Sequence, residues 1–269
     1  MTSPEDSRPD TLTCCTTSNM GPRKASSGNE WVSVRAITFD LDDTLWDIWP
    51  TIAKAEERLH DWLASHYPRV PERYTTLELR TVAREIATAQ PSVAHDPTAV
   101  RKRALEKAAF RCGYQDFLVE PAFEIFFAAR NEVVFFEEVM PALERLASRY
   151  KLGAVTNGNA DLRRIGLGHL FAFCVNSVDV GVAKPDAGMF LEAIRRSGVP
   201  PQDVLHVGDD PIRDVQGARD VGMRTCWVNR GDFPWPGGER ADVEVATLEE
   251  LEVALVGENA ALPSRPGLA

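Results

Sequence analysis

Apolar and polar positions along this chain follow two periods, which divide it into three parts. A short apolar run from Val34 to Phe39 is rich in β-forming residues and is typical of a buried strand. Between residues 47 and 136 the apolar residues recur at helical spacing, and no strand pattern is visible. Beyond residue 141, short apolar runs alternate with amphipathic segments, which predicts strands alternating with helices.

The middle part predicts four helices, separated by proline and glycine. The first carries its apolar residues at Ile52, Ala55, Leu59, Trp62 and Leu63; the others are expected over 77–89, 97–110 and 120–136. A single crossover between two parallel strands needs far fewer residues. We therefore interpret residues 47–136 as an inserted helical domain.

The pattern of the last part, from residue 141 onward, predicts most of an α/β core domain. Strands are expected over 152–156, 173–176, 204–207, 225–228 and 243–245, and helices over 141–150, 189–197 and 215–221. This alternation indicates a doubly wound, mostly parallel sheet, in which ligands bind at the carboxyl ends of the strands. The expected core is 33–46 plus 137–256, with a disordered leader at 1–32 and a flexible tail at 257–269.

Charge and composition exclude some classes of function. The chain has 269 residues and a formal net charge of −10, which argues against a general nucleic-acid binder. No apolar run approaches the ~18 residues that span a bilayer, and no signal peptide is visible. Five cysteines lack metal-binding spacing and are expected to be reduced: Cys14, Cys15, Cys112, Cys174 and Cys226. We expect a cytoplasmic protein, monomeric or homodimeric, with no nucleic-acid or membrane partner.

Three carboxylates stand directly after the first predicted strand. Asp40, Asp42 and Asp43 fall within four positions and would repel one another in a partly buried site. A divalent cation such as Mg²⁺ would relieve that repulsion, because hard cations take oxygen ligands. A solvated acidic turn explains this segment equally well, so other parts of the chain must decide.

Polar residues also follow the later strands. Thr156-Asn157-Gly158 ends the second strand, Lys184-Pro185 comes after the third, and Gly208-Asp209-Asp210 ends the fourth, with Asp214 beyond it. A parallel sheet brings these groups to one edge. Carboxylates, a hydroxyl, a lysine and Mg²⁺ are the groups that phosphoryl transfer requires, since its charge must be neutralised and its oxygens held.

These segments together resemble the four motifs of the haloacid dehalogenase-like (HAD) hydrolase superfamily. The first is similar to Asp40-Leu41-Asp42-Asp43-Thr44-Leu45, and the second to Val155-Thr156-Asn157-Gly158. The third is similar to Lys184-Pro185-Asp186, and the fourth to Val207 through Ala218. The helical insertion between the first two motifs resembles the family's first type of cap, which implies subfamily I.

The resemblance implies a role for each residue. Asp40 would be the nucleophile that forms an aspartyl-phosphate, and Asp42 the general acid and base. Lys184 would offset negative charge. The other implied roles are phosphate binding by Thr156 and the backbone of Asn157, Mg²⁺ binding by Asp40, the carbonyl of Asp42 and Asp209, and support of that shell by Asp214 and Asp210.

Some of these residues have plainer interpretations. Asp43 is expected to cap its own turn, and Asp214 could be a surface charge on a helix. His206, inside a predicted strand, is expected to be a packed core residue. Trp46 and Trp49 stand where the core meets the insertion; we expect Trp46 to pack there and Trp49 to line the substrate pocket.

The leading hypothesis is a Mg²⁺-dependent phosphatase acting on a small phosphomonoester. By analogy within the subfamily, flavin mononucleotide, a riboflavin-pathway phosphate or a nucleotide are candidate substrates. A 2-haloacid dehalogenase is the enzymatic alternative, but that activity needs neither a metal nor Asp42 and Asp209. A phospho-acceptor switch is the non-enzymatic alternative, and it would carry no large cap.

Overall fold

In the computed structural model, the described residues are Trp31, 33–115, Phe117 and 119–256. They form a six-stranded parallel sheet in the order β3-β2-β1-β4-β5-β6. The strands are β1 (Ala36–Phe39), β2 (Lys151–Thr156), β3 (Phe173–Asn176), β4 (Val204–Gly208), β5 (Arg224–Val228) and β6 (Val243–Val245). The doubly wound α/β fold expected from the sequence is confirmed. The predicted leader and tail lie outside the described residues, apart from Trp31.

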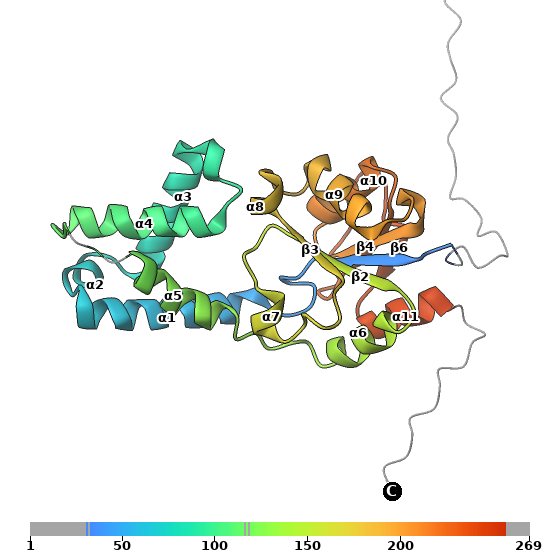
Figure 1. Cartoon of the computed structure of the whole chain (residues 1–269), viewed down its shortest axis with the longest axis horizontal. Helices are drawn as coiled ribbons and strands as arrows, with labels where there is room; N and C mark the ends of the chain where they lie inside the picture. Colours follow the sequence, from blue (N-terminus) through green and yellow to red (C-terminus); the bar gives the residue numbers. More distant parts are fainter. Residues whose placement is uncertain (1–30, 32, 116, 118, 257–269) are drawn as a thin grey trace, which may run out of the picture. The chain divides into compact units, whose positions relative to one another are not determined.

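Helices cover both faces of this sheet (Figure 1). One face carries α9 (Ala187–Ser197) and α10 (Gly217–Asp220), and the other carries α6 (Val139–Ala147) and α11 (Leu248–Val256). The apolar side chains of β1 and β2 are almost completely buried, because parallel strands covered on both faces have no solvent side. Shorter helices, α7 (Leu162–Ile165) and α8 (Ser177–Val180), follow β2 and β3.

The first five α-helices, which all follow β1, have a hydrophobic core of their own. They are α1 (Ile48–His66), α2 (Arg69–Arg73), α3 (Thr76–Ala89), α4 (Pro97–Arg111) and α5 (Val119–Arg130). Their buried apolar residues form one cluster that includes Leu59, Leu63, Leu105 and Phe126. Side-chain caps begin α1, α3 and α4, including a capping box between Thr75 and Glu78 in α3. We call this segment the helical insertion, and its treatment as a separate domain stays a proposal.

Two predicted helices have different bounds in the structure. The helix expected to reach Phe136 ends at Arg130, and the segment after it runs against the turn that follows β1. There Phe136 N–H donates to the Leu45 carbonyl at 3.2 Å, and Phe135 bridges to Trp46. The apolar residues of this segment therefore pack in an extended conformation, although their spacing also suits a helix.

The other correction concerns the segment after β4. A helix was expected only from residue 215, but a π-helical turn, η3 (Pro211–Gln216), precedes α10. The Asp210 side chain accepts hydrogen bonds from the N–H groups of Ile212 and Arg213, and Pro211 occupies the first turn. An aspartate cap followed by proline is a strong start signal for a helix. The sequence analysis also missed α11, whose apolar residues pack against α6 and β6.

Candidate active site

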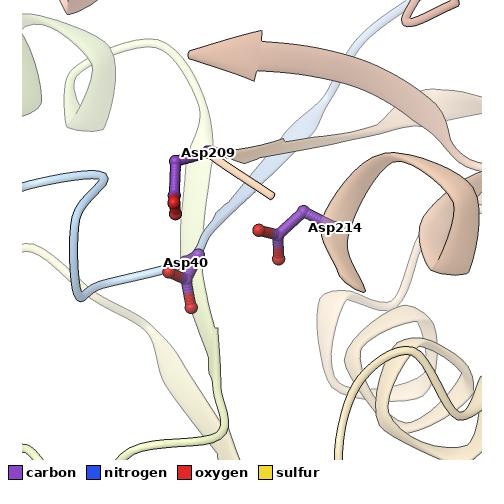
Figure 2. A group of neighbouring side chains, drawn as sticks. All are labelled: Asp40, Asp209 and Asp214. Atoms are coloured by element: carbon purple, nitrogen blue, oxygen red, sulfur yellow. The ribbon is translucent and has the colours of Figure 1, made fainter. Parts of the chain in front are cut away.

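The carboxyl ends of β1 and β4 place two aspartates side by side. β1 and β4 are neighbours, so Asp40 and Asp209, which directly follow them, are at the same edge of the sheet. Successive connections run outward in opposite directions from this pair of strands, which is where doubly wound sheets bind ligands. Asp214 comes from η3, and one carboxylate oxygen from each of the three lies within 4.8 Å of the others. Figure 2 shows the carboxylates of Asp209 and Asp214 directed toward Asp40.

Lys184 joins two of these aspartates from inside the protein. Its Nζ donates to Asp40 Oδ1 at 2.5 Å and to Asp214 Oδ1 at 2.7 Å. The residue is only 5% exposed, so its charge is held by the carboxylates and not by water. Asn157 fixes its backbone: the Asn157 side chain accepts from Lys184 N–H and donates to the Lys184 carbonyl.

Asp214 is bound by further donors that the sequence analysis did not expect. His206 is buried in β4, and its ring packs against Phe190, as the sequence predicted. Its Nε2 also lies 3.1 Å from Asp214 Oδ1. Burial lowers the pKa of His206 against the opposing effect of Asp214, which favours a neutral ring that donates from Nε2. Thr38 lies 2.9 Å from its Nδ1, and Asp210 N–H donates to Asp214 Oδ2. Asp214 is thus a buried structural partner of Lys184 and not a surface charge.

Glycine makes this close approach possible. A Cβ atom at Gly208 would lie 2.3 Å from Asp214 Cγ, a distance that carbon atoms do not tolerate. The Gly-Asp-Asp sequence at the end of β4 therefore allows η3 to bring its aspartate against the strand.

Burial controls the protonation of the cluster. Burial raises the pKa of the Asp40 carboxyl well above its usual value, with Lys184 opposing that effect and Asp214 adding to it. Burial, together with the charge of Asp214, raises the pKa of Asp209 to about 7. Burial would raise the pKa of Asp214 too, but Lys184 and His206 hold it below its ordinary value. Although burial opposes it, the two carboxylates raise the pKa of Lys184.

These donors suit a divalent cation. Three ionised carboxylates and one ammonium leave two negative charges in a partly buried cluster. Burial raises the pKa of Asp209 most, and the charge of Asp214 adds to that effect, so a cation beside Asp209 would favour its ionised form. Oxygen ligands in this arrangement are those that Mg²⁺ takes, so the residues fit the predicted metal.

Asp42 lies apart from this cluster of carboxylates. Arg130 Nη2 donates to both of its carboxylate oxygens at 2.7 Å, and the Trp46 indole N–H donates to Oδ1 at 2.9 Å. Arg130 is the last residue of α5, so the helical insertion supplies this contact. Trp46 is fully buried, as expected of a packing residue.

Sequence reasoning missed Arg130. Its only signal was a single charge at the end of the apolar run Phe126-Phe127-Ala128-Ala129, a pattern that also fits a cation at a helix C-terminus. The pairing with Asp42 joins residues 88 positions apart, which no local pattern encodes.

Thr156 and Gly158 bring the second motif against Asp42. Thr156 is buried at the end of β2, and its Oγ1 accepts from Gly158 N–H at 2.9 Å. A Cβ atom at Gly158 would lie 2.6 Å from Asp42 Oδ2 and 3.2 Å from Thr156 Oγ1. The glycine therefore lets this loop approach the turn after β1.

The remaining predicted residues have other contacts. Asp43 accepts from Ile48 N–H at 3.0 Å with φ of +61°, in agreement with the predicted capping role. The Asp210 carboxylate caps η3, so within the described residues its support of the site comes through its backbone N–H. Thr44 Oγ1 donates to Asp209 at 3.1 Å. Trp49 is 61% exposed near the start of α1, and the Arg80 guanidinium lies 5.4 Å from its ring.

Two curated proteins are similar to this chain over most of its length. The 5-amino-6-(5-phospho-D-ribitylamino)uracil phosphatase YigB of Escherichia coli is 31% identical over 226 residues, which cover 81% of this chain and 94% of that protein. A glyceraldehyde 3-phosphate phosphatase of Methanopyrus kandleri is also 31% identical, over 81% of this chain and 95% of that protein.

A solved structure and a family model extend the likeness to the fold. A structure described as a 2-haloacid dehalogenase from Pseudomonas syringae pv. tomato is 40% identical with a TM-score of 0.78, covering 83% of this chain and 98% of that one. The model described as haloacid dehalogenase-like hydrolase matches residues 34–222, which include every motif residue discussed above. The chain therefore belongs to the haloacid dehalogenase-like hydrolase family, as its four motifs indicated.

Proposed function

We propose that this protein is a Mg²⁺-dependent phosphatase that hydrolyses a small phosphomonoester through an aspartyl-phosphate intermediate. The observation that carries the proposal is the pair of acids at the end of β1. Asp40 belongs to a buried cluster of carboxylates with Lys184, whereas Asp42, two residues on, is held outside that cluster by Arg130 and Trp46. Two carboxylates in different surroundings can perform two different roles.

In the first proposed step, Asp40 attacks the phosphorus atom. Lys184 holds its Oδ1, which orients the carboxylate and leaves Oδ2 as the attacking oxygen. A bond forms between Oδ2 and phosphorus, and the bond from phosphorus to the ester oxygen breaks. Asp42, which takes up a proton as the substrate complex forms, gives that proton to the departing oxygen. Thr156 and the backbone N–H of Asn157 bind the oxygens of the phosphoryl group.

In the second step, water hydrolyses the acyl phosphate. Asp42, now ionised, takes a proton from the water, whose oxygen attacks phosphorus and releases Asp40 and inorganic phosphate. Both steps place the negative charge of the phosphoryl group near the buried carboxylates. Lys184 offsets part of it, because its pKa is raised and it stays protonated.

Mg²⁺ would be held by Asp40, Asp209 and the backbone carbonyl of Asp42, and would neutralise the charge on the phosphoryl oxygens. Asp214 suits the support of Lys184 better than direct ligation, since both of its oxygens already accept hydrogen bonds. Thr44 holds the Asp209 carboxylate in place.

Relatives support a small phosphorylated metabolite as the substrate. The E. coli relative is described as acting on a phosphorylated ribitylamino-uracil, and the M. kandleri relative on glyceraldehyde 3-phosphate. We propose a phosphate ester of a riboflavin precursor, flavin mononucleotide or a nucleotide, in keeping with the subfamily resemblance. The helical insertion would act as the cap that covers it, and Trp49 is the residue proposed to stack on an aromatic ring.

A 2-haloacid dehalogenase remains the second candidate, because the similar P. syringae structure carries that description. The nucleophile and the fold would serve both reactions. However, that activity needs neither a metal nor a second aspartate, whereas this chain has Asp42 in its first motif and places Asp209 beside Asp40. The phospho-acceptor switch is less well supported, since a switch gains nothing from a large helical insertion.

We propose a cytoplasmic location on the basis of the cysteines. Cys112, Cys174 and Cys226 are free thiols among the described residues, which is compatible with a cytoplasmic protein. Within the same residues, no helix has the length and apolar character needed to cross a bilayer. We propose a monomer or a homodimer.

One panel of substrates separates these functions. Purified protein is offered nitrophenyl phosphate, flavin mononucleotide, a nucleoside monophosphate, a sugar phosphate and 2-chloropropionate, each with Mg²⁺ and with EDTA. We expect repeated release of phosphate with Mg²⁺ and none in EDTA. Release of chloride in EDTA would establish the dehalogenase instead, and a single stable phosphorylation without turnover would establish the switch.

A further inference from the structure

We propose that Arg130 binds the substrate, and that its Nη1 donates to an oxygen of the phosphoryl group. This inference rests on the proposed function and assigns to the helical insertion a residue of the phosphate site. The sequence motifs do not include it.

The first observation is an unused donor in a buried position. Arg130 is 2% exposed, and Nη2 makes both hydrogen bonds to Asp42. Among the described residues, Nη1 has no hydrogen-bond partner, although it is buried. A buried donor without an acceptor is costly, so it calls for an explanation, and an acceptor supplied by a ligand is one that fits a site of reacting groups.

The second observation is the position of the guanidinium. The point where a Cβ of Gly158 would lie is 3.3 Å from Arg130 Nη2, 3.2 Å from Thr156 Oγ1 and 2.6 Å from Asp42 Oδ2. The Arg130 guanidinium therefore lies close to the hydroxyl proposed to bind phosphate and to the acid proposed to protonate the leaving group, with Nη2 on that side. Arginine suits this position, because its planar fork of donors can serve a carboxylate and a phosphate at once.

The third observation separates this role from a purely structural one. The end of α5 is already tied to the core by Asn131, whose side chain accepts from Asp161 N–H at 2.7 Å and donates to the Phe127 carbonyl at 2.8 Å. If Arg130 served only to attach α5 to the core, it would not need a charged side chain with an unpaired Nη1. Placing the guanidinium on Asp42 instead links the helical insertion to the reacting groups.

The test measures binding without turnover. In an Asp40→Asn background with Mg²⁺, calorimetry gives the dissociation constants of inorganic phosphate and of an intact phosphomonoester. Arg130→Met in that background should weaken both by about 10- to 100-fold, as expected for a hydrogen bond to a charged group. Arg130→Lys keeps the charge but has one nitrogen, so phosphate affinity should still fall measurably, by about three- to tenfold. In the active enzyme, Arg130→Met should raise KM by a factor similar to the loss of affinity.

Arg195→Met is the matched control. Arg195 carries the same charge on α9, with an exposed side chain paired to Glu192, and should leave phosphate affinity unchanged. Melting curves report whether each variant folds; if Arg130→Met does not, Arg130→Lys decides. Unchanged phosphate affinity in a folded Arg130 variant would overturn this inference and leave the proposed function intact. Failure of Asp40→Asn itself to bind phosphate, with no turnover by the wild type, would overturn both.

Discussion

Asp40 and Asp42 are two positions apart in sequence but have different neighbours. Asp40 shares a buried cluster with Lys184, whereas Asp42 lies against Arg130 and the indole of Trp46. Residues two apart point the same way along an extended strand, but Asp40 and Asp42 both lie beyond the end of β1, in the segment that leads into the turn. The two acids can therefore be tested separately.

Replacing Asp40 with asparagine should abolish turnover, because an amide oxygen is a poor nucleophile toward phosphorus. The substitution is almost isosteric, and Lys184 keeps its bond to Asp214, so the fold should persist. Steady-state assays on nitrophenyl phosphate, with circular dichroism as the control for folding, make the measurement. More than a trace of activity in a pure preparation would remove Asp40 as the nucleophile.

Replacing Asp42 with asparagine should affect poor leaving groups most. Alkyl phosphates need a proton on the departing oxygen, whereas nitrophenolate leaves readily without one. The melting temperature should also fall, since buried Arg130 loses its counter-charge at a cost of about 1–3 kcal/mol. Comparing kcat on nitrophenyl phosphate and on a sugar phosphate checks this. An equal loss on both substrates would argue for a different role.

Trp49 tests whether the start of α1 contacts the substrate. If its exposed indole stacks on an aromatic substrate, Trp49→Leu should raise KM for flavin mononucleotide by up to about tenfold, from a contribution of about 0.5–1.5 kcal/mol. A sugar phosphate should be little affected. Equal losses on both substrates, together with a lower melting temperature, would refute stacking.

At the scale of elements, the site depends on β4 and η3 lying unusually close. Gly208 ends the strand, and Asp214 belongs to the π-helical turn that packs against it. Phe190 of α9 supports the next turn in the same way, because a Cβ at Gly217 would lie 2.5 Å from its ring. These contacts position the groups that bind Lys184.

Gly208→Ala should therefore disturb catalysis as well as stability. The added methyl group would displace Asp214 and weaken its hold on Lys184, so kcat should fall at least tenfold, because a lost hydrogen bond to a charged group is worth about 1.5–3 kcal/mol. Gly198→Ala is the control: its φ is +73° with open space around it, so only about 1 kcal/mol of backbone strain is expected. Kinetics and melting curves of both variants provide the comparison, and identical behaviour would contradict this account.

At the scale of the whole molecule, the sheet collects charge that one lysine cannot balance. The aspartates come from two strands and a turn spread over more than half of the chain. Their repulsion opposes folding unless a proton or a cation is present. Stability should therefore depend on pH and on metal together.

In EDTA, Asp209 should make the protein less stable as pH rises. Its pKa is raised to about 7 in the folded state from 3.8, so between these values the folded protein binds more protons than the unfolded chain. The free energy of unfolding therefore falls as pH rises from about 4 toward 7, and levels off above. Mg²⁺ should reduce this loss of stability, because the cation balances the charge of ionised Asp209 as the bound proton does at lower pH.

Melting temperatures between pH 4.5 and 8.5, with EDTA and with Mg²⁺, measure the effect. Asp209→Asn should have a shallower pH dependence in EDTA and gain little from Mg²⁺. A wild-type profile that is identical to that of the variant in EDTA would show that Asp209 has an ordinary pKa.

The sequence by itself determined the parallel sheet, the strands, most helices and the family. Those features come from local periods and from residues placed directly at strand ends, such as Asp40, Thr156 and Asp209, because parallel topology brings all strand ends to one edge. The helix predicted over 131–136 is wrong, since an apolar run packs equally well extended against a neighbour. The prediction also missed the first part of η3, residues 211–214.

Only the tertiary structure decided how the site residues pair. Asp42 with Arg130, Lys184 with Asp214, and His206 with Asp214 are contacts across 88, 30 and 8 positions. Burial then sets the charge of each group, raising the pKa of Asp209 and lowering that of His206. Neither distance nor burial is written in a local pattern, because both depend on which distant segments exclude water from the same place.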